Sequence, residues 1–159
     1  MLLLLVSLGC GKVDSITPEA GMWSYDADSV TFLEDGCGLQ TGLNFFDMLI
    51  DQIDDDGFRF IDTNGDAFTC SRGDSDFSCA ALTTETTASS RAELTFVSDN
   101  AGSFLSAESL ERTLTITGTC EGADCDGLFS SVTFPCATTV EMSASYDGPA
   151  DALDTGFSD

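Results

Sequence analysis

Apolar and polar residues alternate along much of this chain, the pattern of β-strands with one buried and one solvated face. In residues 113–117, Thr-Leu-Thr-Ile-Thr, the apolar pair takes one face and the threonines take the other. Turn residues recur about every 8–12 positions, which is the spacing of a sandwich or barrel of short strands. The predicted strands are 21–26, 29–34, 57–62, 66–72, 76–82, 91–98, 111–119, 128–134 and 136–146.

The fold class that this pattern predicts is all-β. We expect an antiparallel meander of about eight strands that forms a small β-barrel or a β-sandwich. Apolar residues between Leu39 and Ile53 recur instead at helical spacing, although residues 46–50 also alternate as a strand would. We predict one short helix around 41–53. Residues 83–90, Thr-Thr-Glu-Thr-Thr-Ala-Ser-Ser, are expected to be a polar loop or an edge continuation.

The segment from 58 to 82 predicts two successive hairpins. Asp62 and Gly65 stand first and fourth in Asp-Thr-Asn-Gly, which favours a type I turn followed by a glycine bulge. That loop places Phe60 opposite Phe68, whereas a two-residue Asn-Gly turn would place Ile61 there. The bulged register also sets Phe58 opposite Cys70 and gathers more aromatic area on one face, so we prefer it.

A two-residue Asp74-Ser75 loop in the second hairpin pairs Cys70 with Cys79. Counting from the turn, these cysteines form a non-hydrogen-bonded pair, whose α-carbons lie about 4.5 Å apart. That separation is within reach of a disulfide.

The charge of the chain is strongly one-sided. It has 28 acidic residues, five basic residues and no histidine, for a formal charge of −23. Binding of nucleic acid requires clustered lysine and arginine, which four scattered arginines do not supply, so nucleic acid is excluded as a partner. Anionic membrane surfaces are excluded as electrostatic partners for the same reason.

The chain contains seven cysteines, and the context of Cys10 accounts for the odd one. The opening Met-Leu-Leu-Leu-Leu-Val-Ser-Leu-Gly-Cys resembles the end of a bacterial lipoprotein signal, in which the cysteine is lipidated and becomes the new N-terminus. The run is short and carries no basic residue, so the signal is expected to be truncated or Met1 not to be the true start. The resemblance implies an outer-membrane lipoprotein of the bacterial cell envelope, facing the periplasm or the cell surface, with the membrane as a partner through the lipid.

Six cysteines then remain for three bridges. We predict Cys70–Cys79, Cys120–Cys125 and Cys37–Cys136 out of the 15 connectivities that six cysteines allow. Each bridge is expected to stabilise the domain by about 2–5 kcal/mol. The expected organisation is a signal segment over 1–9, the lipidated cysteine and a tether over 10–20, an all-β domain over 21–147, and an acidic disordered tail over 148–159.

Residue types and their spacing suggest several candidate sites. Asp62, Asn64 and Asp66 resemble the first half of a calcium-binding EF-hand loop, but Ala67 and Gly73 stand where that loop needs glycine and glutamate, so turn chemistry is the preferred interpretation. We expect no metal and no cofactor. A serine or cysteine nucleophile usually needs a histidine base, which the chain lacks, so we predict that it is not an enzyme.

Gly21-Met22-Trp23 resembles the Gly-x-Trp motif that opens the first strand of lipocalins, which are eight-stranded barrels that hold apolar ligands. The family carries an arginine that packs over the tryptophan, and residues 136–146 contain no basic residue. The alternative interpretation is that Trp23 plugs one end of a β core. A carrier of a small apolar ligand would line its lumen with Trp23, Phe58, Phe60, Phe68, Phe96 and Phe134.

The sequence therefore predicts a non-catalytic, lipid-anchored envelope β domain that binds or interacts with a protein or a small apolar ligand. The alternatives are a lipocalin-like carrier and a hydrolase that uses two carboxylates. A carrier predicts an unfilled apolar cavity, a binding module predicts a filled core, and a hydrolase predicts two carboxyl groups about 5–9 Å apart in a cleft.

Overall fold

The computed structural model describes residues 15–150, apart from residues 44, 46 and 129. The described residues form ten strands, one turn of 3-10 helix and one four-residue helix. In chain order the elements are β1 (Gly21–Tyr25), η1 (Ala27–Ser29), β2 (Thr31–Asp35), β3 (Asp47–Asp51), β4 (Gly57–Ile61), β5 (Ala67–Arg72), β6 (Asp76–Cys79), β7 (Leu82–Ser89), β8 (Ala92–Ser106), β9 (Ser109–Glu121), α1 (Cys125–Leu128) and β10 (Cys136–Gly148).

Eight strands close into an antiparallel barrel. Their order is β1-β3-β4-β5-β6-β8-β9-β10, and β10 pairs back with β1. The all-β prediction is confirmed, and of the two architectures left open by the sequence the barrel is the one that forms. Closure leaves no unpaired edge around this ring, which is how small β-domains avoid edge-to-edge association.

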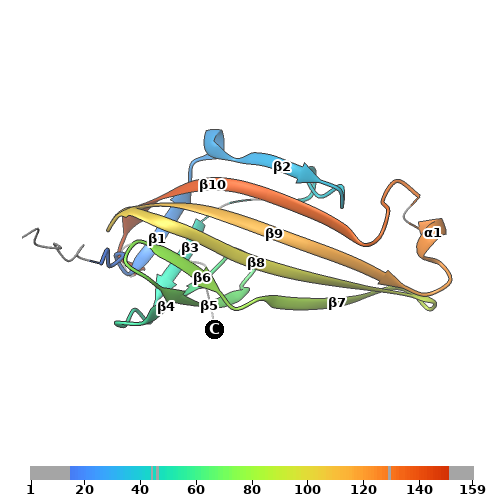
Figure 1. Ribbon diagram of the computed structural model, residues 1–159, viewed down its shortest axis with the longest axis horizontal. Coiled ribbons are helices and arrows are strands. Elements are labelled where there is room, and N and C mark those ends of the chain that lie inside the picture. The colour runs from blue at the N-terminus through green and yellow to red at the C-terminus, as the bar shows by residue number, and fades with distance from the viewer. Residues whose placement is uncertain (1–14, 44, 46, 129, 151–159) are drawn as a thin grey trace, which may run out of the picture.

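Three barrel strands continue far beyond the ring. Strands β8, β9 and β10 have 15, 13 and 13 residues, and Figure 1 shows them running the length of the molecule. Residues 92–98 of β8 pair with β7, and residues 138–141 of β10 pair with β2. We call this five-stranded open sheet, in the order β7-β8-β9-β10-β2, the extension.

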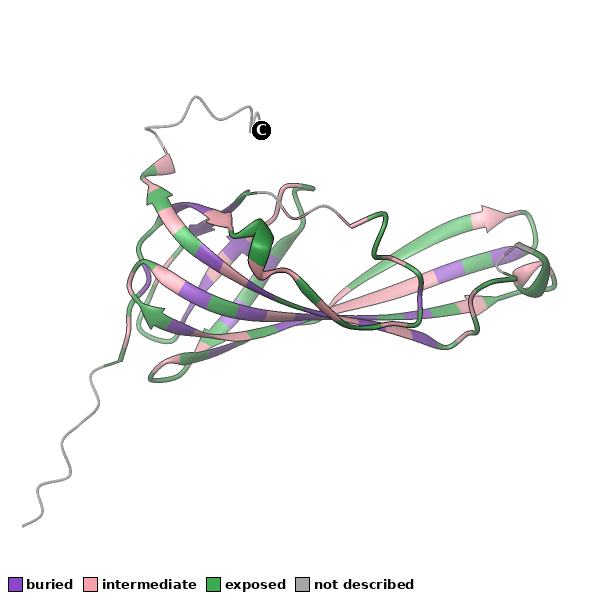
Figure 2. Ribbon diagram, turned by 90° about the horizontal axis from the view of Figure 1, so that it is seen from above, coloured by how far each residue is buried: buried purple, intermediate pink, exposed green. Residues whose placement is uncertain are grey.

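One face of the long strands is buried along most of their length. Even-numbered residues of β9 from Leu110 to Gly118 are buried or half-buried, and odd-numbered residues are half-buried or exposed. Figure 2 shows this alternation in the long strands. The period of two follows from the pleat, which sends successive side chains to opposite faces.

The barrel interior is packed with aromatic and aliphatic side chains. Trp23 is fully buried, and its ring makes edge contacts with Phe104 and Tyr146 at centroid distances of 6.4 and 5.9 Å. Phe60 and Phe68 stack at 4.7 Å. The core consists of Trp23, Met48, Ile50, Phe58, Phe60, Phe68, Cys70, Phe77, Phe104, Leu110 and Ala144.

Residues 15–20 lie against one end of the barrel, which we call the closed end. The Ile16 amide donates to the Asp74 carbonyl, and Arg72 donates to the Ile16 carbonyl and the Thr17 hydroxyl. Trp23 Nε1 donates to the Glu19 carbonyl at 3.1 Å. The folded domain thus includes residues that we expected to belong to the tether, because their backbone groups are satisfied by the barrel.

A second core covers part of the extension. Leu114, Ile116, Val140 and Met142 are buried there against side chains of residues 36–43 and Phe45, which we call the covering loop, and against residues of β1, β2 and β8. Cys37–Cys136 joins this loop to β10. Asp35 also holds it, since its carboxylate accepts the amides of Leu39 at 2.6 Å and Gln40 at 3.1 Å.

The predicted helix around 41–53 is wrong. Residues 47–51 form β3, which pairs with β1 on one side and β4 on the other. Met48 and Ile50 are each 1% exposed in the barrel core, so the alternating pattern prevails over the helical one. Two available strand partners satisfy the backbone groups of β3 and bury its apolar face, which outweighs local helical spacing.

The predicted strand 128–134 is also wrong. Its described residues lie at the end of α1 and in a loop, because β9 already pairs with β8 and β10 and offers no free edge there. The segment 83–90 largely belongs to an edge strand, β7. The strands predicted over 91–98 and 111–119 are longer than expected, since each spans both barrel and extension.

Both predicted hairpin registers are present. Phe60 lies opposite Phe68, Phe58 opposite Cys70, and Cys70 opposite Cys79. Gly65 has a φ of 84°, as the glycine bulge requires. The structure contains the disulfides Cys37–Cys136, Cys70–Cys79 and Cys120–Cys125, which are the three pairs that the sequence predicts.

Candidate functional site

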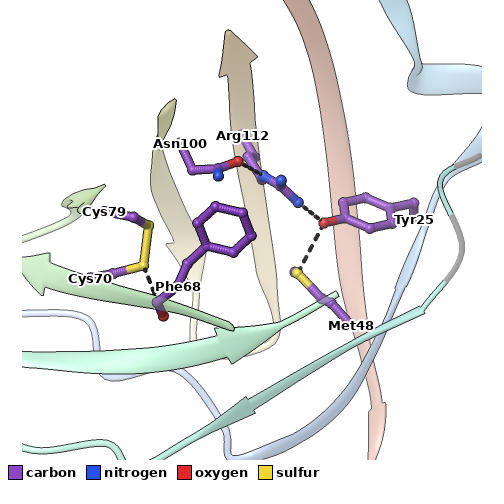
Figure 3. Close-up of a disulfide and its surroundings, with 7 residues drawn as sticks. All are labelled: Tyr25, Met48, Phe68, Cys70, Cys79, Asn100 and Arg112. Carbon is purple, nitrogen blue, oxygen red and sulfur yellow. Dashed lines mark hydrogen bonds between the residues drawn. A yellow bond between two sulfur atoms is a disulfide. The ribbon is translucent and has the colours of Figure 1, made fainter. Parts of the chain in front are cut away.

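A buried arginine lies where the barrel core meets the second core. Arg112 belongs to the inward face of β9 and is 5% exposed. Its Nε donates to Asn100 Oδ1 at 2.7 Å, and its Nη1 donates to the Tyr25 hydroxyl. Figure 3 shows the guanidinium extended between these two side chains, which come from β8 and β1. The Phe60 ring lies 4.7 Å from the guanidinium carbon, a cation–π distance.

Arg112 borders a small cavity of about 50 Å³ at the end of the barrel opposite residues 15–20. We call this cavity the chamber. The covering loop supplies two half-buried apolar side chains to its wall, and the turn between β4 and β5 supplies polar ones. The chamber is lined by Tyr25, Leu43, Phe45, Asp62, Thr63, Asn64, Arg112 and Leu114.

In the described part of the chain, no carboxylate forms an ion pair with Arg112. Among the described residues the ion pairs are Arg59–Asp51 and Arg91–Asp124, both at partly exposed positions. Arg72 donates to backbone carbonyls at the closed end. Burying a guanidinium without an opposite charge costs several kcal/mol, which hydrogen bonds to neutral groups offset in part.

The two groups that accept hydrogen bonds from Arg112, Asn100 and Tyr25, are neutral. Burial raises the pKa of Tyr25 above its ordinary value, and the charge of Asp62 acts in the same direction, while Arg112 lowers it in part. The phenol therefore stays protonated at neutral pH and serves as a dipole. Its hydroxyl also lies 3.1 Å from Met48 Sδ. Asn100, which is 2% exposed, leaves its Nδ2 without a hydrogen-bond partner among the described residues.

The aromatic residues proposed to line a ligand lumen do not lie together around one cavity. Trp23, Phe58, Phe60 and Phe68 are at most 4% exposed and fill the barrel core against one another. Phe96 packs against the second core. Phe134 lies near the far end of the extension, in the wall of a separate pocket of about 360 Å³.

The weak calcium candidate forms a hairpin turn. The Asp62 carboxylate accepts the amides of Asn64 at 2.9 Å and Asp66 at 3.0 Å, which is the side-chain-to-backbone bonding of an Asx turn. The described residues hold no group of three or more acidic or cysteine side chains placed for a metal ion. Asp62 and Asn64 nevertheless reach the chamber, as wall residues.

Cys10, the predicted lipidation site, lies outside the described residues.

Two carboxylates occupy a groove on the outer face of the sheet. Glu111 and Glu141 line it together with the hydroxyl groups of Ser29, Thr31 and Thr113, among others, and its volume is about 310 Å³. They belong to neighbouring strands in diagonal register, since Thr113 lies opposite Glu141. This groove is the place in the described structure that most resembles the cleft of the hydrolase hypothesis.

The sequence analysis missed Arg112 as a site residue, although a signal for it is present. Arg112 shares its parity with Leu110, Leu114 and Ile116, and therefore belongs to the apolar face of its strand. Asn100 shares parity with Phe104 in the same way. A charged residue in register with a buried face indicates an internal polar site, whereas the charge balance treats Arg112 only as one of four scattered arginines.

Comparison with protein-family models, with curated proteins and with solved structures finds no match for this chain. No helix among residues 15–150, as far as they are described, has the length and apolar character needed to span a membrane.

Proposed function

We propose that this protein is a non-catalytic binding domain of the bacterial cell envelope, held at the outer membrane by a lipid on Cys10, and that its binding site is the chamber. One observation carries the proposal: a cationic donor is buried beside a cavity in a domain whose barrel core is filled. Small-molecule sites combine apolar walls with a few fixed polar groups, and the chamber has this composition.

The packing of the lumen favours this function over the carrier of an apolar ligand. Trp23, Phe58, Phe60 and Phe68 occupy the interior that such a carrier would leave open. The chamber, at about 50 Å³, is far smaller than the roughly 300 Å³ or more of a typical site for a drug-sized ligand. It suits a small polar molecule, or the polar head of a larger one.

Blocking the chamber tests its role in binding. Thr63 is half-buried in the chamber wall, so Thr63→Trp should fill the space with little disturbance of either core. Thr83→Trp, at an exposed position of β7, is the matched control. Propionate, propionamide and 1-propanol are titrated into each protein while backbone amide chemical shifts are followed.

We expect saturable shifts at chamber residues with at least one of the three compounds. These shifts should persist in Thr83→Trp and disappear in Thr63→Trp. Absence of saturable binding by the natural chain, or equal binding by both variants, would overturn the assignment of the chamber as a binding site.

The anchor is tested separately, by the intact mass of protein extracted from bacterial membranes. We expect loss of residues 1–9, a gain of acyl mass on Cys10, and no free thiol. Cys10→Ala should leave the protein in the soluble envelope fraction. A membrane-bound Cys10→Ala protein, or an extracted protein without acyl mass, would contradict the anchor while leaving the chamber proposal intact.

A further inference from the structure

The charge of Arg112 imposes a requirement on whatever occupies the chamber. Two of its nitrogens are satisfied, Nε by Asn100 and Nη1 by Tyr25. The hydrogen bonds of Arg112 to described residues are made by Nε and Nη1, and Nη2 is not one of the fully buried unpartnered atoms, which are Arg72 Nε and Asn100 Nδ2. A guanidinium presents its donors as a planar fork that matches the two oxygens of a carboxylate.

Among the described residues, no acidic side chain of the chamber wall forms an ion pair with Arg112. Asp62 is the acidic residue in the described part of the wall. That carboxylate instead accepts the backbone amides of Asn64 and Asp66 within the turn. The phenol of Tyr25 and the amide of Asn100 supply dipoles, which do not neutralise a buried charge.

We propose that the chamber binds a small monocarboxylate, with the carboxylate oxygens accepting hydrogen bonds from Arg112. The inference rests on the proposed function and adds the chemical class of the ligand. Binding would supply the missing negative charge in a partly desolvated site, where charged hydrogen bonds are stronger than in water.

The size and walls of the chamber define the rest of the ligand. A volume of about 50 Å³ accommodates a carboxylate with a very short aliphatic chain. Leu43, Phe45 and Leu114 supply apolar contacts for that chain, while Thr63 and Asn64 border the polar side. The net charge of −23 repels anions at long range, so we expect a dissociation constant on the order of millimolar.

The experiment compares an anion with a neutral molecule of nearly the same shape. Propionate and propionamide are titrated into the full chain by amide chemical shift. Four proteins are compared: the natural chain, Arg112→Met, Arg112→Lys and Arg91→Met. The last variant removes the same charge from an exposed arginine that pairs with Asp124 near the far end of the extension, so it controls for net charge.

The natural chain and Arg91→Met should bind propionate at least about tenfold more tightly than propionamide, and Arg112→Met should lose this preference. Arg112→Lys keeps the charge without the planar fork and should retain a reduced preference. Without ligand, Arg112→Met should be no less stable to urea than the natural chain, because it removes an uncompensated buried charge.

The outcomes separate this inference from the proposed function. Equal binding of propionate and propionamide overturns the carboxylate assignment and leaves the chamber as a site for neutral molecules. A preference that survives in Arg112→Met also overturns it. Absence of binding by both compounds and by 1-propanol overturns both proposals. If Arg112→Met does not fold, the comparison of the two compounds on the natural chain remains decisive.

Discussion

At the scale of single residues, Gly65 and Gly127 both have room for a side chain, but they differ in backbone conformation. A Cβ added at either position meets no atom within 4 Å, but Gly65 has a φ of +84° and Gly127 does not lie in the left-handed region. A side chain in the left-handed region costs roughly 1–2 kcal/mol. The turn between β4 and β5 therefore depends on glycine for its backbone alone.

We expect Gly65→Ala to lower the free energy of unfolding by about 1–2 kcal/mol, while Gly127→Ala leaves it unchanged or raises it by about 0.5–1 kcal/mol. Urea unfolding of the two variants under oxidising conditions provides the measurement. Equal effects of the two substitutions would show that the conformation of Gly65 is not what the turn requires.

Two aspartates are expected to respond to pH with opposite signs. Burial acts to raise the pKa of Asp35, but hydrogen bonds from the Gln40 and Leu39 amides and the Thr138 hydroxyl outweigh it and hold the pKa below its ordinary value. Burial and the charge of Asp62 raise the pKa of Asp66. A lowered pKa stabilises the fold above the unfolded-state pKa, and a raised one stabilises it below.

At pH 7, Asp35→Asn should therefore lower the urea midpoint and Asp66→Asn should raise it. As the pH falls, the Asp66→Asn difference should shrink above about 4, because the folded-state carboxyl of Asp66 takes up its proton first. The Asp35→Asn difference should shrink only below about 4, where the unfolded-state carboxyl becomes protonated while the folded one stays ionised. A destabilised Asp66→Asn protein at pH 7 would contradict the stated environment of that carboxyl.

The side-chain positions of single residues could be predicted where the pattern of a strand and its adjoining turn contain the information locally. The parity of Phe58, Phe60, Phe68 and Cys70 placed them on one buried face, because the intervening turn fixes their register locally. The prediction failed for Arg112, although Asn100 is only 12 positions away, on the strand that pairs with β9. Its other partner, Tyr25, is 87 positions away on β1, and closure of the barrel brings it to Arg112.

At the scale of elements, the disulfides differ chiefly in the length of chain that they close. Cys37–Cys136 joins residues 99 positions apart and fixes the covering loop, whereas Cys120–Cys125 joins residues five apart at the end of β9. In the chain-entropy model a longer loop gives a larger constraint on the unfolded state.

Replacing both members of Cys37–Cys136 with alanine should lower the free energy of unfolding by about 4–5 kcal/mol, against about 2 kcal/mol for Cys120–Cys125. The comparison is made by urea unfolding of the two double variants without reductant. A larger loss from the Cys120–Cys125 pair would mean that local strain, and not loop length, governs these bridges.

Element prediction was limited by competition for strand partners. The helix predicted over 41–53 does not form, because β1 and β4 each offer β3 an edge with which it can pair. The strand predicted over 128–134 failed for the opposite reason, since β8 and β10 already occupy both edges of β9. Neither fact is visible in a local window, because edge occupancy is a property of the assembled sheet.

At the scale of the whole molecule, the charge of −23 acts on the compact state as a uniform repulsion. We expect the urea midpoint to rise when sodium chloride increases from about 0.01 M to about 0.15 M, which shortens the Debye length from roughly 30 Å to roughly 8 Å. Potassium chloride should have the same effect. A midpoint that stays constant or falls would show that surface repulsion is not a significant part of the stability.

The choice between barrel and sandwich also belongs to this scale. Closure depends on the pairing of β1 with β10, which joins Trp23 to Tyr146 across most of the chain. Strand patterns specify which faces are buried but not which distant edges meet, so the sequence left both architectures open. The extension follows from the same topology, since β8, β9 and β10 are longer than the other five strands of the ring.

The position of residues 15–20 would orient the domain at a bilayer if the proposed lipid on Cys10 is its anchor. The chain enters the domain at the closed end, and the chamber lies at the opposite end, beside the turn between β4 and β5. A domain attached through its N-terminal residues would place the chamber on the side away from the lipids, with the barrel between the two. A ligand of the chamber would then enter from the aqueous side. A ligand leaving the hydrocarbon phase could reach the chamber only if the whole domain changed its orientation.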